Sequence, residues 1–186
     1  MSVELLEAVR ERWREDGAPT AEVLRPGLGD ADMDALTAPL GLRLPPEART
    51  LWSWHDGADL GIDTRWIGKG WEPLPLARAV SLTQEYRALL WDSPYGDGRE
   101  YWPESFLILT RPDRPDVLTI DCGVNSSTSP VYSATVEEFG STLIADSIGE
   151  LVERWLRVME QRLAHFDRSQ SRWRYEWDAI DEAWRI

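Results

Sequence analysis

The chain has 186 residues, of which 42% are hydrophobic and 28% are charged, a composition typical of a globular protein with a sizeable core. Its formal net charge of −13 disfavours nucleic acids and anionic membranes as partners, because their phosphate groups carry the same sign. The apolar runs fall well short of the roughly 20 residues that span a bilayer, and the acidic start Met1–Glu4 does not resemble a signal peptide. The sequence therefore favours a cytoplasmic location.

A helix is predicted over residues 2–15, because Ser2 is suited to the N-cap position and apolar residues recur at every fourth position. The next expected elements are a short helix from Asp30, a helix over Leu44–Gly57, a short strand near residues 64–67 and a helix over residues 76–90. The helix over Leu44–Gly57 begins with two prolines, which suit a first turn, and presents one apolar face. Gly57 stands where a glycine in the left-handed conformation ends a helix.

Three strands are expected in the second half, over Ser105–Thr110, Val117–Cys122 and Pro130–Ala134. No helical pattern separates these strands, which favours antiparallel pairing. A long helix is predicted to begin near Ser147, which has capping-box spacing with Glu150. An amphipathic helix is predicted over Trp173–Ile186, from tryptophans four residues apart. The predicted fold class is α+β, with a mainly antiparallel sheet flanked by helices, an N-terminal helix and a C-terminal amphipathic helical extension.

The residues that catalysis or metal binding would need are few. The sequence contains no nucleotide-binding, serine-hydrolase or zinc-protease motif. Cys122 is the only cysteine and there are two histidines, so we expect no disulfide, no metal site and no other cofactor. His55–Asp56 and Asp121–Cys122 could be read as catalytic pairs, but a packed histidine and a small residue in a strand are the simpler interpretations.

A loop over residues 91–103 is the strongest candidate for a binding site. It and the next residue combine acids with aromatic side chains, the pattern of a surface that binds a basic protein. The candidate residues are Asp92, Tyr95, Asp97, Glu100, Tyr101 and Glu104. The alternative interpretation is a structured loop whose aromatic side chains pack into the core.

The order of several short motifs resembles the SUKH superfamily, which includes fungal regulators of cell-wall synthesis and bacterial immunity proteins. The segment over residues 42–57 resembles its signature helix, and the matching positions are Leu44, Pro45, Leu51, Trp52, Asp56 and Gly57. Further matches, in order, are Trp102–Pro103, Asp121, Pro130–Val131 and Asp146–Ser147. The resemblance covers about residues 30–163, so the first helix and the tail over residues 165–186 are additions to one domain over residues 1–186. The loop over residues 123–129 lacks the expected glycines.

The resemblance implies a non-enzymatic protein-binding role, as in immunity proteins that neutralise toxins, many of which are nucleases. A nuclease needs a basic surface to hold phosphate groups, and the acids before residue 151 carry all of this chain's excess charge. The leading hypothesis is therefore an immunity protein with a basic protein partner, such as a nuclease toxin. One alternative is a regulatory scaffold that binds a host protein in envelope assembly, with the tail as a docking helix. A lesser alternative is an enzyme of unknown type.

Overall fold

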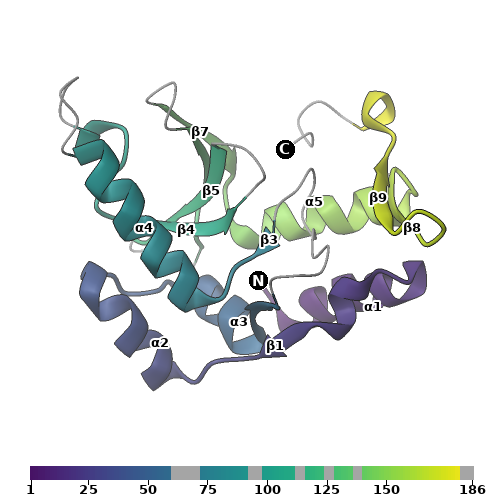
Figure 1. Ribbon diagram of the computed structural model, residues 1–186, viewed down its shortest axis with the longest axis horizontal. Helices are drawn as coiled ribbons and strands as arrows, with labels where there is room; N and C mark the ends of the chain where they lie inside the picture. The colour runs from purple at the N-terminus through teal and green to yellow at the C-terminus, as the bar shows by residue number, and fades with distance from the viewer. Residues whose placement is uncertain (60–71, 92–97, 112–115, 124–127, 136–139, 181–186) are drawn as a thin grey trace.

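The computed structural model describes all of the chain except residues 60–71, 92–97, 112–115, 124–127, 136–139 and 181–186 (Figure 1). The α-helices are α1 (Val3–Asp16), α2 (Asp30–Thr37), α3 (Pro46–Trp54), α4 (Leu76–Trp91) and α5 (Ile148–Glu160). Short 3-10 helices are η1 (Pro19–Glu22), η2 (Ala38–Leu40), η3 (Gly98–Glu100) and η4 (Trp177–Ala179). The strands are β1 (Leu24–Pro26), β2 (His55–Ala58), β3 (Glu72–Pro73), β4 (Phe106–Arg111), β5 (Asp116–Asp121), β6 (Val131–Thr135), β7 (Gly140–Ala145), β8 (Ala164–Asp167) and β9 (Arg172–Tyr175).

The main sheet is antiparallel, and its five strands lie in the order β3-β4-β5-β6-β7. The predicted α+β class is confirmed, and the antiparallel order of β4 to β7 follows from short connections between strands adjacent in sequence, whereas α4 lies between β3 and β4. α4 crosses one side of the sheet, and α5 lies beside α1 at the other end of the molecule (Figure 1). The strand β7 was not predicted, because Ser141, Thr142 and Leu143 are all exposed and show no apolar alternation.

The middle of the sheet forms the centre of the core. Leu107 and Ile108, neighbours on β4, point to opposite faces and are both fully buried. The pairing of β4 with β5 shifts register just after Ile108. The N–H of Ile108 donates to Thr83 Oγ1 of α4 at 3.0 Å. The sheet is therefore covered on both faces at β4, and the hydroxyl of α4 accepts the hydrogen bond of a buried N–H at the irregularity.

The predicted starts of the first and last long helices are confirmed. Ser2 Oγ accepts the N–H of Leu5 at 3.3 Å, and Ser147 Oγ accepts the N–H of Glu150 at 2.9 Å. Glu150 in turn accepts the N–H of Asp146 at 2.7 Å, one residue before the position that a capping box uses. These starts depend on contacts three or four residues apart, which is why the sequence pattern alone predicts them.

The predicted helix over Leu44–Gly57 is wrong at its end. α3 ends at Trp54, and His55 is extended, with φ −151° and ψ 134°, as the first residue of β2. Strand β2 pairs with β1, and Leu24 lies opposite Ala58. Gly57 does have a positive φ of 70°, but within β2 and not at a helix end. A long-range strand pairing therefore ends the helix early. The predicted strand near residues 64–67 lies outside the described residues.

The predicted helix over Trp173–Ile186 is wrong over its first residues. The segments β8 and β9 form an antiparallel hairpin in which Phe166 lies opposite Trp173, with ring centroids 6.0 Å apart. Trp173 is buried while its neighbours Arg172 and Arg174 are not, so the alternation of a strand was present in the sequence. The spacing of Trp173 and Trp177 suggested a helix because a four-residue interval fits both patterns.

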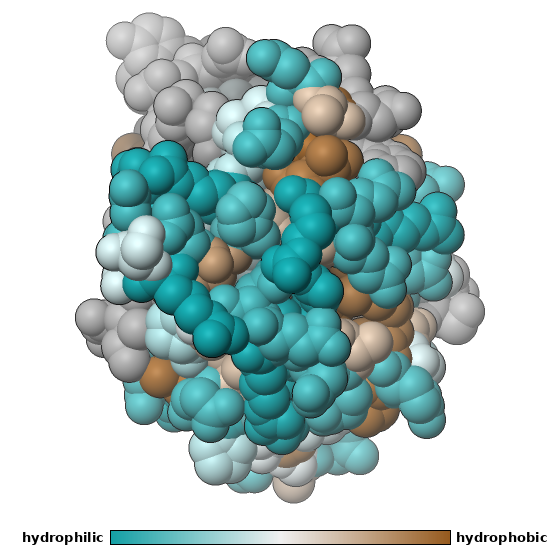
Figure 2. Space-filling view, turned by 90° about the vertical axis from the view of Figure 1, so that its right-hand side faces the viewer, coloured by the Kyte–Doolittle hydropathy of each residue, from teal (hydrophilic) through white to brown (hydrophobic). Residues whose placement is uncertain are grey.

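The hairpin is attached to the end of α1. Arg168 donates to the carbonyl oxygens of Asp16 at 2.9 Å and Glu15 at 2.8 Å, which are acceptors left open at a helix C-terminus. The buried Asp16 carboxylate also pairs with Arg162 at 2.8 Å and with Arg12 at 2.7 Å. Hydrophilic side chains cover most of this end of the molecule (Figure 2). The tail therefore packs on the rest of the chain through residue 180, where Ile180 is 1% exposed.

Candidate protein-binding site

The candidate site lies between α4 and the sheet, in the segment Gly98–Ser105 that is called the η3 segment below. Gly98 holds this segment against the end of α4, because a Cβ there would lie 2.1 Å from the carbonyl oxygen of Leu90. Of the six residues predicted for the site, Glu100, Tyr101 and Glu104 lie in this segment. The other three, Asp92, Tyr95 and Asp97, lie outside the described residues.

The η3 segment divides its side chains between the surface and the core. Glu100 and Glu104 are exposed, and Tyr101 is 38% exposed. Trp102 turns inward and is 1% exposed, with its ring 5.2 Å from Tyr86 and 6.0 Å from Phe106. The alternative interpretation, aromatic packing into the core, is confirmed for Trp102, while the binding role of the exposed residues beside it stays a prediction.

Two arginines that the sequence analysis did not include lie in the same place. The guanidinium carbons of Arg87 and Arg99 are 5.2 and 4.8 Å from the ring centroid of Trp91. Arg99 Nε is 3.6 Å from Glu104 Oε1, and Arg87 donates to the carbonyl oxygens of Leu40 and Glu104. Burial lowers the pKa of the Arg87 guanidinium, and the nearby Glu104 opposes that shift. The site thus has charges of both signs.

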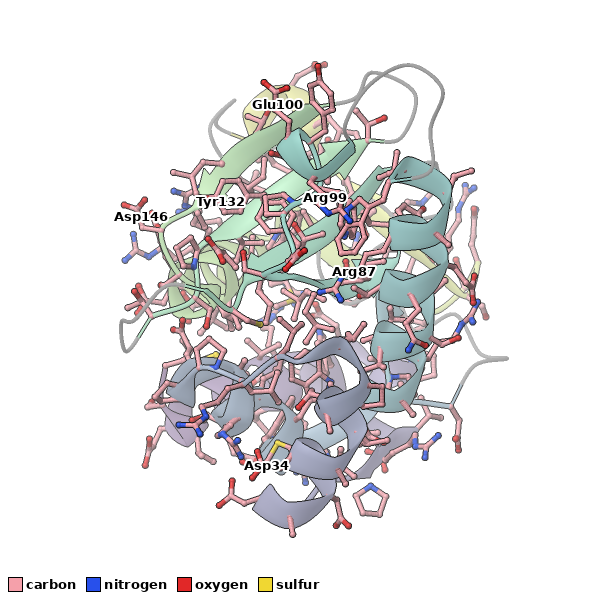
Figure 3. The ribbon with its side chains drawn as sticks, turned by 90° about the vertical axis from the view of Figure 1, so that its left-hand side faces the viewer. Asp34, Arg87, Arg99, Glu100, Tyr132 and Asp146 are labelled. Atoms are coloured by element: carbon pink, nitrogen blue, oxygen red, sulfur yellow. The ribbon has the colours of Figure 1, made fainter. Side chains whose placement is uncertain are left out.

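The accessible surface continues from the η3 segment onto the sheet. Tyr132 of β6 stacks on Phe106 at 5.1 Å and is half-buried, and Leu143 of β7 lies opposite it and is 50% exposed. In the view of Figure 3, Arg99 lies between α4 and the sheet, with Glu100 above it and Tyr132 toward the strands of the sheet. The binding face is defined below as Glu100, Tyr101, Glu104, Tyr132 and Leu143. The sheet residues were missed because their exposure depends on strand order.

The residues of the signature helix that carry the SUKH resemblance are in the interior. Leu44, Leu51 and Trp52 are at most 7% exposed. Asp56 is 5% exposed, and its Oδ1 accepts the N–H of Leu76, the first residue of α4, at 2.7 Å. Burial raises the pKa of Asp56, while the bond from Leu76 and the charge of Arg25, 3.6 Å away, oppose that shift. This carboxylate therefore caps a helix N-terminus from a distant segment.

Glu47 has the same function at α5. It is 3% exposed, and its two oxygens accept the N–H groups of Ile148 at 3.0 Å, Gly149 at 2.8 Å and Ser129 at 3.0 Å. The amino group of Met1 lies 3.1 Å from the same carboxylate. A single side chain on α3 thus satisfies the first turn of a helix that begins a hundred residues later.

His55 and Cys122, which suggested catalytic pairs in the sequence, both have surroundings that favour a structural role. His55 Nδ1 lies 2.7 Å from the carbonyl oxygen of Arg25. Burial, and secondly the charge of Asp121, raise the pKa of the Cys122 thiol to about 12, so it is protonated at neutral pH. Among the described residues, no group of three or more histidines, cysteines and acids is arranged to hold a metal ion.

An apolar cavity lies between α1, α3 and β4, away from the binding face. Its lining includes Trp13, Leu51, Trp52, His55 and Leu109. A ligand site usually adds several convergent polar groups to such a lining. Since Trp13, Trp52 and Leu109 are also buried members of the hydrophobic core, we assign the cavity to core packing.

A model of the SMI1/KNR4 family (SUKH-1) matches residues 27–154, which is more than half of the chain. The chain belongs to this family. No curated protein matches it closely enough to suggest a narrower role. SUKH-1 proteins are in general non-catalytic immunity or regulatory domains that bind protein partners. No helix in the described parts of the chain has the length and apolar character to cross a membrane.

The SUKH-1 match runs from the residue after β1 to the middle of α5 and contains the whole binding face. The segments outside it, before residue 27 and after residue 154, are in contact with each other through Asp16, Arg162 and Arg168. The two additions seen in the sequence therefore meet on one side of the SUKH-1 core.

Proposed function

We propose that this SUKH-1 protein is an immunity protein that acts in the cytoplasm and neutralises a toxin by binding it through the binding face. The observation that carries the proposal is the joint exposure of Glu100, Tyr101 and Glu104 beside the apolar side chains of Tyr132 and Leu143. An accessible aromatic centre with charged residues around it is the usual anatomy of a protein interface. Asp92, Tyr95 and Asp97, which precede the η3 segment in sequence, belong to the same proposal.

The chemistry of the partner follows from charge. A chain with a net charge of −13 attracts a cationic surface over long distances, and a nuclease toxin carries such a surface to bind phosphate groups. Covering that surface would block access of the nucleic acid without any reaction. Electrostatic attraction of this kind mainly raises the association rate and weakens with added salt.

The arginines of the site would contribute to selectivity. Arg99 pairs with Glu104 at 3.6 Å, so a partner has to present both a cation for the glutamate and an acceptor for the arginine. In a complex with a uniformly basic protein, Arg99 would lie opposite other cations, and this repulsion would lower the affinity of that protein. The mixed site therefore favours one particular basic partner over basic proteins in general.

The test uses the product of a toxin-like gene adjacent to this one, purified as its isolated toxic domain. We expect the wild-type protein to bind it and to suppress its activity, and the double variant Glu100→Lys with Glu104→Lys to associate at least tenfold more slowly at low salt. The matched control is Glu160→Lys with Glu176→Lys, which makes the same charge change at exposed positions at the end of α5 and in the tail. Equal loss in both pairs would mean that only net charge matters, and the binding face would be wrong. A non-toxic host protein as the specific partner would instead favour a regulatory role.

A further inference from the structure

Strand β7 is at the edge of the sheet, and no described strand pairs with its outer side. Its sequence, Gly-Ser-Thr-Leu-Ile-Ala, contains no charged residue and no proline. Soluble proteins usually protect an edge strand with charges, proline or a covering segment, because its open N–H and C=O groups can pair with another strand. Ser141, Thr142 and Leu143 are all exposed, so most of this edge is accessible.

The ladder shows which backbone groups face outward. The N–H of Asp121 donates to the carbonyl oxygen of Pro130 at 3.1 Å, so alternate residues from Pro130 onward, including Tyr132, direct their backbone groups to β5. Ser133 then bonds toward β7, and its partner there is Thr142. By the same alternation, the N–H and C=O groups of Ser141 and Leu143 point away from the sheet.

The open edge has a defined end and a defined neighbour. Arg154 of α5 donates to the carbonyl oxygen of Ile144 at 2.8 Å and so occupies the edge beyond Leu143. The side chain of Leu143 lies opposite Tyr132 and belongs to the binding face. A strand added here would therefore be continuous with the surface that was assigned to the partner.

We propose that an extended, basic segment of the partner protein pairs with β7 as an additional strand of the sheet. This inference rests on the proposed function and specifies how the partner is held: its main chain bonds to Ser141 and Leu143, and apolar side chains on one face of it contact Leu143 and Tyr132. A second copy of this chain is the less favourable occupant, because both copies would carry a net charge of −13. A basic segment is attracted instead, and Asp146, exposed one residue after β7, is near its path.

The probe is a synthetic nine-residue peptide of alternating lysine and valine, with a glutamate–valine peptide as its charge control, added to the full-length 15N-labelled protein. We expect the basic peptide to shift the amide signals of Ser141 and Leu143 and to slow their hydrogen exchange at least tenfold, and the acidic peptide to do neither. Shifts confined to the η3 segment, or no shift with either peptide, would overturn the proposal.

Two variants isolate the strand pairing. Ser141→Pro removes an outward N–H but no bond to β6, so it should fold and bind the basic peptide at least tenfold more weakly, whereas Ser141→Ala should bind as the wild type does. Leu143→Lys is a second variant that leaves the backbone intact and repels the lysines, and it should also weaken binding. Equal affinity of all four proteins would exclude the edge as the binding site.

The outcome is separable from that of the proposed function. If Ser141→Pro still neutralises the toxin while Glu100→Lys with Glu104→Lys does not, the immunity role stands and strand addition is wrong. If sedimentation instead shows a wild-type dimer that Ser141→Pro converts to a monomer, the edge pairs with a second copy and the partner-strand proposal is overturned.

Discussion

The acids of this protein occupy two contrasting regions. Glu47 and Asp56 are buried in or beside the family's signature segment, and each accepts backbone N–H groups at the first turn of a distant helix. Glu100 and Glu104 are exposed on the η3 segment, where the only carboxylate pair described is that of Glu104 with Arg99. Residues of one chemical type therefore stabilise the fold in one region and are available to a partner in the other.

This contrast explains why a family can be identified without its partners. The signature residues Leu44, Trp52 and Asp56 are buried, and Asp56 also accepts the N–H of Leu76 at a helix N-terminus. The binding face makes few such contacts, so its residues are free to differ between proteins that bind different partners. Membership of SUKH-1 therefore identifies the fold and the general kind of function, while the choice of partner is what we propose the binding face to decide.

Removing the buried acid Glu47 should produce the largest effect. Glu47→Ala leaves the N–H groups of Ser129, Ile148 and Gly149 without an acceptor, so we expect a loss of about 3–5 kcal/mol in the free energy of unfolding. Urea unfolding monitored by tryptophan fluorescence measures this loss. Glu104→Ala is the control in the exposed region and should change stability by less than about 0.5 kcal/mol. Similar losses of stability in the two variants would show that the buried and the exposed acids do not differ in their contribution to the fold.

A second substitution tests the signature glycine. Gly57→Ala would place a Cβ 2.4 Å from the backbone nitrogen of Pro75, at a residue with φ of 70°, so we expect a loss of roughly 2–4 kcal/mol. Gly41→Ala is a matched control, because Gly41 has φ of 69° but nothing within 4 Å of the added Cβ. It should cost only about 1 kcal/mol, the conformational part alone. If the two variants lose equal stability, the close approach to Pro75 is not important.

The raised pKa of Asp56 makes its contribution to the free energy of unfolding depend on pH. Because burial raises its folded pKa, the folded state holds this proton more tightly than the unfolded state does. The resulting stabilisation is complete below the ordinary aspartate pKa of about 4 and is lost as the pH rises through the folded value. Asp56→Asn keeps an acceptor for Leu76 and has no charge to titrate. Its stability relative to the wild type should therefore increase over that pH range. A constant difference in the unfolding free energy across the range would contradict the assignment.

The smallest effect on stability is expected in the exposed region. Glu100→Lys with Glu104→Lys should change the unfolding free energy by no more than about 0.5 kcal/mol, because both side chains are exposed. The same pair should reduce the dependence of toxin association on salt concentration, measured by stopped-flow fluorescence. A large loss of stability in this variant would show that the η3 segment serves the fold, like the buried acids.

Local patterns predicted some of the molecule well. The starts of α1 and α5 depend on Ser2 and Ser147, each bonded to an N–H three residues away. Glu100, Tyr101 and Glu104 were selected from composition alone, and their exposure could be anticipated for the acids. The sequence could not predict which aromatic residue is exposed. Tyr101 and Trp102 are adjacent, and only the fold decides that Trp102 is buried and Tyr101 is not.

The sequence by itself determined the starts of α1 and α5, the antiparallel sheet, the net charge and the family, because each depends on neighbours in the chain, on composition or on the order of short motifs. Tertiary structure alone decided that α3 stops at Trp54, that Trp173 lies in a hairpin, and that β7 is an open edge. It also brought Glu47 to α5 and Tyr132 to the binding face. These features depend on hydrogen bonds and packing between residues far apart in sequence, and no local periodicity records such contacts.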